Sequence, residues 1–116
     1  MNIHAESIKD PDVIAFENLV RRTGIKAIRG FARIGLAYYQ CILSLCYSMG
    51  FKVEQSYNMA MRWIQKSAEQ NYAPAQRALG RFYEVGRGVP HDKEKALEWY
   101  SKAAAQGVFA DSMGGL

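Results

Sequence analysis

Apolar residues recur at helical spacings through most of the chain, and the pattern itself repeats. Shifting residues 37–71 onto 73–107, an offset of 36, gives eleven identities in 35 positions, where ordinary composition would give about two. The identities include Leu43/Leu79, Tyr47/Tyr83, Ala60/Ala96 and Trp63/Trp99. Because these positions recur at intervals of three and four, each helix carries one apolar stripe. The sequence therefore predicts two repeats, each built from two helices.

Capping residues mark the ends of these helices. Gly86 can adopt the left-handed conformation that ends a helix, and Pro90 cannot continue one. Ser56 and Asp92 then stand at equivalent positions, and both are favoured N-caps. Upstream, Asp10-Pro11 is typical of a helix start, and Gly24 follows the expected end. The predicted helices span residues 11–23, 25–34, 37–49, 57–70, 73–85 and 93–106.

These elements predict an all-α chain in which antiparallel helix hairpins stack as a short right-handed solenoid. Residues 37–72 form repeat one and residues 73–109 form repeat two. We expect residues 1–36 to be N-terminal helices that act as a degenerate repeat or a cap. Residues 110–116 resemble residues 73–79 after a one-residue insertion, which indicates the start of an incomplete third repeat.

The length of 116 residues predicts one domain, and 49% hydrophobic with 22% charged residues is a composition that folds. The N-terminus lacks the apolar stretch and cleavage site of a secretory signal. The most apolar window, residues 36–51, is shorter than the roughly 20 residues that cross a bilayer. We therefore expect a soluble, cytoplasmic protein with no transmembrane segment.

Residues 73–107 carry a dense motif, AxAQxxLGxxYxxGxGVPxDxxKAxxWYxKAAxQG. This motif resembles the Sel-one-like repeat family, whose members are similar to tetratricopeptide repeats. Repeat one matches in part, since Ser44, Lys52 and Glu54 stand in place of Gly80, Gly88 and Pro90. The resemblance implies a helical superhelix of a family whose members mostly act as adaptors between proteins and in which catalysis is uncommon. It also implies that the motif residues are structural: the alanines (Ala60, Ala68, Ala96, Ala104) allow close helix approach, Trp63 and Trp99 fill the core, and Gly86 and Gly88 shape the turn.

In such solenoids the first helix of each pair lines the inner curve. In repeat two, Arg77, Arg81 and Glu84 lie off the apolar stripe at spacings of four and three, so they share one helix face. This face is either a partner-binding surface or an ordinary solvated face.

The helix expected over residues 37–49 is apolar nearly all round, which is typical of a helix that is buried on every side. Either the N-terminal helices fold over it, or it is an interface for another chain. Since about three repeats are usually needed for a stable array, we expect a homodimer or dependence on a partner protein. Tyr39 and Leu45 are the residues predicted in that contact.

Charged residues are unevenly distributed along the first third of the chain, although the net charge of the whole chain is only +4. Residues 1–20 carry one lysine against four acids, and residues 21–40 carry five bases and no acid. Four of these bases (Arg22, Lys26, Arg29 and Arg33) are spaced by four, three and four, which predicts a basic stripe on one helix. The stripe could meet nucleic-acid phosphates, an acidic protein, a membrane surface or only solvent. A nucleic-acid partner is the alternative and is not favoured, because no aromatic residue interleaves the stripe and no RNP-type or zinc-finger motif accompanies it.

The sequence offers no catalytic, cofactor or metal site. No serine is followed three residues later by lysine, and Gly86-x-Gly88 lacks the rest of a phosphate-binding loop. Cys41 and Cys46 are five residues apart, so they point to different sides of one helix and cannot pair. They are also too few for a structural zinc, which takes four ligands. We therefore expect a protein that is not an enzyme.

Overall fold

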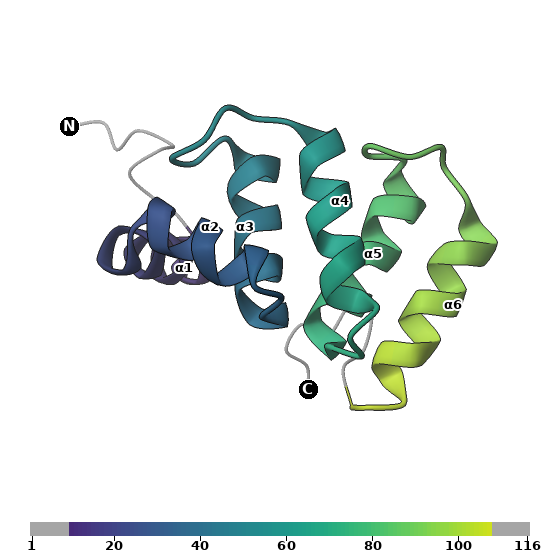
Figure 1. Cartoon of the computed structure of the whole chain (residues 1–116). Coiled ribbons are helices and arrows are strands. Elements are labelled where there is room, and N and C mark those ends of the chain that lie inside the picture. Colours follow the sequence, from purple (N-terminus) through teal and green to yellow (C-terminus); the bar gives the residue numbers. More distant parts are fainter. Residues whose placement is uncertain (1–9, 108–116) are drawn as a thin grey trace.

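The computed structural model describes residues 10–107, which form six α-helices in a row (Figure 1). The helices are α1 (Pro11–Thr23), α2 (Ile25–Arg33), α3 (Ala37–Met49), α4 (Tyr57–Ala68), α5 (Ala73–Val85) and α6 (Lys93–Ala104). The predicted all-α fold is confirmed. The predicted helix ends differ by at most two residues, and the expected third repeat over residues 110–116 lies outside the described residues. Within residues 10–107, none of the helices is both long and apolar enough to span a membrane.

Three of the six described helices, α1, α4 and α6, begin where the sequence places capping side chains. Asp10 accepts a hydrogen bond from the backbone N–H of Asp12 at 2.7 Å. Ser56 accepts from Met59 at 3.1 Å, and Asp92 accepts from Lys95 at 3.0 Å. Each bond satisfies a donor that a helix start leaves unpaired, so local sequence sets these boundaries.

The loops α3–α4 and α5–α6 have the same backbone path. Gly50 and Gly86 both end a helix in the left-handed conformation, with φ of 68° and 75°. Further along, Lys52 adopts a φ of 66° where the second loop has Gly88 at 69°. The loop shape is thus preserved in repeat one even though a lysine replaces the glycine.

Antiparallel pairs α3–α4 and α5–α6 stack through α4 and α5, and α2 packs against α3 (Figure 1). Two clusters of buried side chains hold this row together. The N-terminal core contains Val20, Ile28, Ala32, Ile42, Leu43 and Cys46. The C-terminal core contains Cys41, Ala60, Met61, Ile64, Ala68, Ala75, Leu79 and Phe82. Helix α3 contributes to both.

The two tryptophans lie at the edges of these cores. Trp63 is half-buried against the N-terminal core and Trp99 against the C-terminal core. Their outer faces carry lysines, with Lys66 Nζ 6.0 Å from the Trp63 ring centroid and Lys102 Nζ 5.0 Å from that of Trp99. The expectation that the tryptophans fill the core therefore holds only in part, because each packs against the edge of a core.

Buried glutamines join successive hairpins in the same way each time. Gln40 Nε2 donates to the carbonyl of Ala32 at 3.1 Å, and Gln76 Nε2 donates to the carbonyl of Ala68 at 3.4 Å. Their own carbonyl oxygens accept from later glutamines, Gln70 to Gln40 at 2.8 Å and Gln106 to Gln76 at 2.9 Å. These glutamines recur at equivalent positions of the repeats, but their role in joining hairpins is visible only in the structure.

Candidate binding groove

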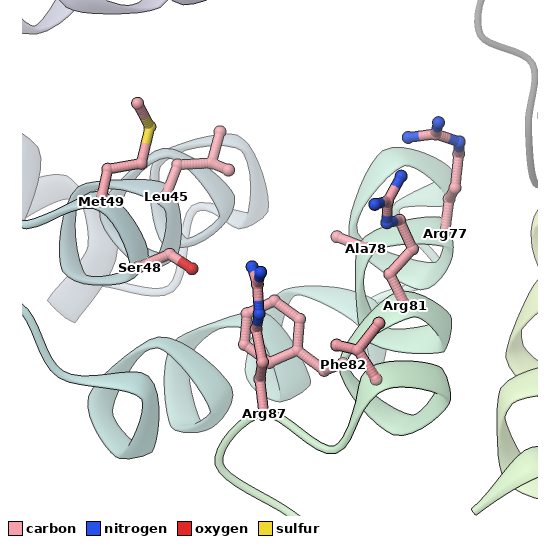
Figure 2. A pocket seen from close by; sticks show the side chains of 9 residues that line it. Leu45, Ser48, Met49, Arg77, Ala78, Arg81, Phe82 and Arg87 are labelled. Atoms are coloured by element: carbon pink, nitrogen blue, oxygen red, sulfur yellow. The ribbon is translucent and has the colours of Figure 1, made fainter. Parts of the chain in front are cut away.

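A groove of about 290 Å³ lies between the first helices of the two repeats, α3 and α5 (Figure 2). Helix α3 contributes Leu45, Ser48 and Met49, helix α5 contributes Arg77, Ala78, Arg81, Phe82 and Val85, and the following loop contributes Arg87. The groove thus brings together three of the five residues predicted to bind a partner: Leu45, Arg77 and Arg81.

The repeat register explains why these side chains meet. Leu45 and Arg81 are 36 residues apart and therefore occupy equivalent places on α3 and α5, as do Met49 and Val85. Stacking α5 beside α3 places the same face of both helices on one side of the molecule. The sequence set each helix face, and the stacking of the repeats formed the groove.

The floor and the α3 side of the groove are apolar. Phe82 is buried in the C-terminal core and Ala78 packs at its edge. Above them, Met49 is 44% exposed and Val85 is 52% exposed. Apolar surface is thus left uncovered on both rims.

The α5 side carries the positive charge. Arg77 and Arg81 are one helical turn apart, and Arg87 extends from the loop in the same direction (Figure 2). The Arg87 guanidinium carbon lies 5.2 Å from the centroid of the Tyr57 ring, which is a cation–π distance. The left-handed Gly86 and Gly88 on either side of Arg87 set the loop that presents it. Arg87 was not among the predicted site residues, because its neighbours across the groove come from α3 and α4.

Glu84 was predicted to share a surface with Arg77 and Arg81, and this stays a prediction. Its carboxylate accepts a hydrogen bond from the Tyr100 hydroxyl of α6 at 2.5 Å, and it does not line the groove. Burial is the largest cause that raises the pKa of Tyr100 to about 12, and this hydrogen bond is the second. Glu84 therefore links α5 to α6, because the helix turns its side chain toward the hairpin partner.

Tyr39 and Leu45, the two residues predicted in a homodimer contact, lie on different surfaces. The Tyr39 ring packs 4.7 Å from Phe31 and 5.1 Å from Tyr38, at the edge of the N-terminal core. For the face of α3 that carries Ile42 and Cys46, the structure shows the first of the two alternatives, since α2 covers this face. Self-association stays a prediction. Tyr39 and Leu45 do not lie together on one surface that a second copy of the chain would contact.

The basic stripe does not lie on one helix, so that prediction is wrong. Arg22 belongs to α1, whereas Lys26, Arg29 and Arg33 belong to α2. Gly24, at a φ of 90°, separates the two helices and changes the chain direction. Arg29 is half-buried and lies near Cys46. Burial raises the pKa of the Cys46 thiol, and the positive charge of Arg29 partly lowers it again.

The described residues provide little for chemistry. They contain no group of three or more histidine, cysteine and acidic side chains that could hold a metal ion. Both cysteines are free thiols and buried. Burial raises the pKa of Cys41 to about 12 and, despite Arg29, that of Cys46 to about 11. The thiols are therefore protonated at neutral pH and are poor nucleophiles.

The Sel1 repeat family model, which describes the Sel-one-like repeat, matches residues 35–72 and 73–108. Among solved structures, a Sel1 repeat protein from Oxalobacter formigenes is 36% identical with a TM-score of 0.73, over 84% of this chain and 82% of that chain. A protective antigen of uropathogenic Escherichia coli with an SLR fold is 36% identical with a TM-score of 0.71, over 73% of this chain and 18% of that one. Helicobacter pylori cysteine rich protein B has a TM-score of 0.70 over 96% of this chain and 74% of that chain; at 19% identity it shows the fold alone.

Two fungal regulators also match part of the chain. Chitin synthase regulator SKT5 of Saccharomyces cerevisiae is 39% identical over 67 residues, which is 54% of this chain and 10% of the regulator. Chitin synthase regulatory factor 3 of Schizosaccharomyces pombe is 35% identical over 79 residues, which is 64% of this chain and 8% of the factor. The chain thus spans a tenth or less of the length of these relatives.

Proposed function

Since this chain belongs to the Sel1 repeat family, we propose that it is a non-catalytic module that binds another protein through the groove between α3 and α5. The observation that carries the proposal is the groove itself, in which side chains from two successive repeats meet on one open surface. Leu45 comes from repeat one, and Arg77 and Arg81 come from repeat two. A partner that fills this groove contacts both repeats at once.

The chemistry of the groove is typical of the centre of a protein interface. Interface centres are enriched in aromatic residues, methionine and arginine, and arginine is among the residues that contribute most to binding energy. The groove combines Phe82 and Met49 with three arginines. The burial of Leu45 and Met49 by a partner would supply apolar contact, and the arginines would orient it.

The curated relatives point in the same direction. SKT5 and regulatory factor 3 are named as regulators of chitin synthase, and a protein that regulates an enzyme acts in many cases by contacting another protein. The matched segment is a small part of those regulators, which suits a binding module within a larger assembly. Which protein this chain binds is left to the experiment.

Site-specific cross-linking tests the proposal. Cys41 and Cys46 are buried, so a Ser48→Cys variant carries one accessible thiol, inside the groove, for a photoactivatable label. A Ser101→Cys variant carries the same label on the exposed surface of α6 and is the matched control. We expect the label at position 48, but not the label at position 101, to cross-link a partner protein. The same protein should bind the unlabelled chain in calorimetry.

Leu45→Glu then tests the groove directly with the purified partner. We expect at least a tenfold loss of affinity with an unchanged helical circular dichroism signal. The proposal is wrong if positions 48 and 101 capture the same proteins, or if Leu45→Glu leaves the measured affinity intact.

A further inference from the structure

Exposed apolar side chains gather at the turn between α2 and α3. Among residues 10–107, nine large apolar side chains are exposed, and four of the nine fall within residues 31–38. Ile34 is the most exposed of the nine, at 73%. Single exposed apolar residues are normal on a protein surface, whereas a cluster of them marks an interaction site or an aggregation risk. We call this cluster the turn patch, and its members are Phe31, Ile34, Leu36 and Tyr38.

Contacts between aromatic rings hold part of the turn patch in place. The ring centroid of Phe31 lies 4.7 Å from that of Tyr39, which lies 5.1 Å from that of Tyr38. The Tyr38 centroid in turn lies 6.5 Å from that of Tyr72, just before α5. These distances are typical of packed aromatic pairs. Phe31 and Tyr38 are thus fixed by their neighbours, although 37% and 42% of their surfaces stay exposed.

Positive charge borders the turn patch. Helix α2 carries Lys26, Arg29 and Arg33, and no acidic residue occurs in residues 18–53. Within residues 10–107, none of these three bases forms an ion pair. Lys26 and Arg33 are exposed and seven residues apart, so they lie on the same side of α2. Arg33 directly precedes Ile34, which brings its charge to the edge of the patch.

The combination of charge and apolar surface argues against two occupants. A second copy of the chain, seated on the same patch about a two-fold axis, would bring the bases of both copies together without an acid between them. A nucleic acid would meet the bases with its phosphates. However, the two most exposed members of the patch, Ile34 and Leu36, are aliphatic and offer no ring for a nucleobase to stack on.

A membrane that contains anionic lipids fits both features. Aromatic residues such as Tyr38 are favoured at the membrane–water interface, because they combine an apolar ring with a polar group. Lysine and arginine have long apolar stems, so their charged ends reach lipid phosphates while apolar neighbours enter the headgroup region. Each such base strengthens binding to an anionic membrane about fivefold.

We infer that the turn patch docks on an anionic lipid surface, with Ile34 and Leu36 among the lipid headgroups and Lys26 and Arg33 on the phosphates. This inference goes beyond the proposed function, because the patch shares no residue with the groove. Tyr38 of the patch and Met49 of the groove are eleven residues apart in α3, which is roughly 16 Å along the helix axis. The module can therefore hold a protein partner while it is bound to a membrane.

Vesicle binding by the full chain tests the inference. Vesicles of phosphatidylcholine with one-third phosphatidylserine should sediment the protein, and vesicles of phosphatidylcholine alone should bind it at least tenfold more weakly. Higher salt concentration should weaken the binding, because salt screens exposed charges. Absence of binding to the anionic vesicles, or equal binding to both kinds of vesicle, overturns the inference.

Matched variants locate the apolar contact. Ile34→Ser should weaken binding to the anionic vesicles at least tenfold, since the side chain no longer gains from leaving water. Leu97→Ser is the control, because Leu97 is also exposed but lies on α6, outside the patch. It should leave vesicle binding unchanged. Equal effects of the two substitutions would show that the patch is not the docking surface.

Charge variants test the basic border. Lys26→Gln with Arg33→Gln should weaken binding to the anionic vesicles about thirtyfold and reduce its dependence on salt. Arg62→Gln with Lys93→Gln removes two exposed charges from α4 and α6 and should have a much smaller effect. Equal losses in the two double variants would mean that net charge, and not this border, attracts the protein to the membrane.

A fluorescent label measures insertion directly, without removal of a charge. Cys41 and Cys46 are buried, so Ile34→Cys provides one accessible thiol for a nitrobenzoxadiazole label. Its emission should shift to the blue with anionic vesicles, while the same label on Leu97→Cys should not respond. No shift at position 34, or an equal shift with soluble polyglutamate in place of vesicles, overturns the inference; the latter result would identify an acidic protein segment as the occupant.

Discussion

At the scale of single residues, two neighbouring glycines of the α5–α6 loop have different roles. Gly86 and Gly88 both have a positive φ, of 75° and 69°. A Cβ on Gly86 would lie 3.4 Å from the nearest atom, the backbone nitrogen of His91. A Cβ on Gly88 would lie only 2.6 Å from the carbonyl oxygen of Tyr57, at the start of α4. Gly88 thus allows both the turn and the close contact between successive hairpins.

Gly88→Ala should therefore destabilise the fold more than Gly86→Ala. The left-handed conformation costs an alanine about 1–2 kcal/mol at either position. At Gly88 the contact with the Tyr57 backbone adds an overpacking cost of about 1–3 kcal/mol. Urea unfolding of the two variants measures the difference, and equal losses would show that the loop can move away from α4 freely.

The buried glutamines make a second prediction at this scale. Gln76 is 2% exposed, donates to the carbonyl of Ala68 and accepts from Gln106. Gln76→Met keeps a similar volume but removes the hydrogen bonds that Gln76 makes to Ala68, Asn71 and Gln106, each worth about 0.5–1.5 kcal/mol. Gln65→Met is the control, because the Gln65 amide donates to Glu69 in an exposed contact, and surface changes usually stay within about 0.5 kcal/mol. Similar unfolding free energies for both variants would mean that the hairpin joint does not depend on Gln76.

At the scale of helices, α3 is distinctive because it is packed from two sides. Cys41 faces the C-terminal core and Cys46 faces the N-terminal core. Burial raises the pKa of Cys41 from its ordinary value of 9.0 to about 12 and that of Cys46 to about 11. Charging either thiol would require water or a cation inside a core.

This burial predicts a loss of stability at alkaline pH. Below pH 9 the thiol is protonated in both folded and unfolded chains, so it adds no pH dependence. Above pH 9 the unfolded chain releases the proton and the folded chain retains it. The free energy of unfolding then falls with rising pH by about 1.4 kcal/mol per pH unit for each thiol, until the folded pKa is reached.

Cys41→Ala isolates the contribution of the more strongly shifted thiol. Between pH 8 and pH 10.5 the wild-type chain should lose about 2 kcal/mol more than this variant. Urea unfolding at the two pH values measures the difference in slope, apart from any constant loss caused by the smaller side chain. Parallel pH profiles would contradict a protonated Cys41 in the folded state.

At the scale of the whole molecule, α3 joins the two cores, so they should unfold together. Ile28 is fully buried in the N-terminal core, and Trp99 packs against the C-terminal core. In a Trp63→Phe background Trp99 is the remaining tryptophan of the chain and reports on the far core. Ile28→Ala should cost about 2–5 kcal/mol and lower the midpoint that Trp99 fluorescence reads. An unchanged Trp99 midpoint would show two independently unfolding halves.

Self-association is also a property of the whole molecule. The homodimer was expected because α3 is apolar nearly all round, but α2 covers part of that surface. A dimer that uses the open surface around Leu45 uses the groove. Light scattering should then give twice 13.1 kDa for the wild-type chain and the single mass for Leu45→Glu. A single mass for both chains would exclude this dimer at the concentrations used.

Much of the fold could be predicted because its signals are local. The N-caps Asp10, Ser56 and Asp92 each bond within three residues, and Gly86 ends its helix by its own backbone conformation. The apolar stripes depend on spacing within one helix, and the repeat appears as a simple offset. Six helices, their boundaries and the hairpin repeat were therefore accessible from the sequence.

The binding groove was only partly accessible, because its parts lie far apart in the chain. Arg77 and Arg81 could be assigned to one face, but their meeting with Leu45 and Arg87 depends on how α5 stacks beside α3. The pairing of α5 with α6 places Glu84 against Tyr100, and the stacking on the preceding hairpin seats Gln76 against Ala68. Helix spacing specifies which residues share a face; which faces meet depends on side-chain packing between hairpins, and that packing is a property of the assembled fold.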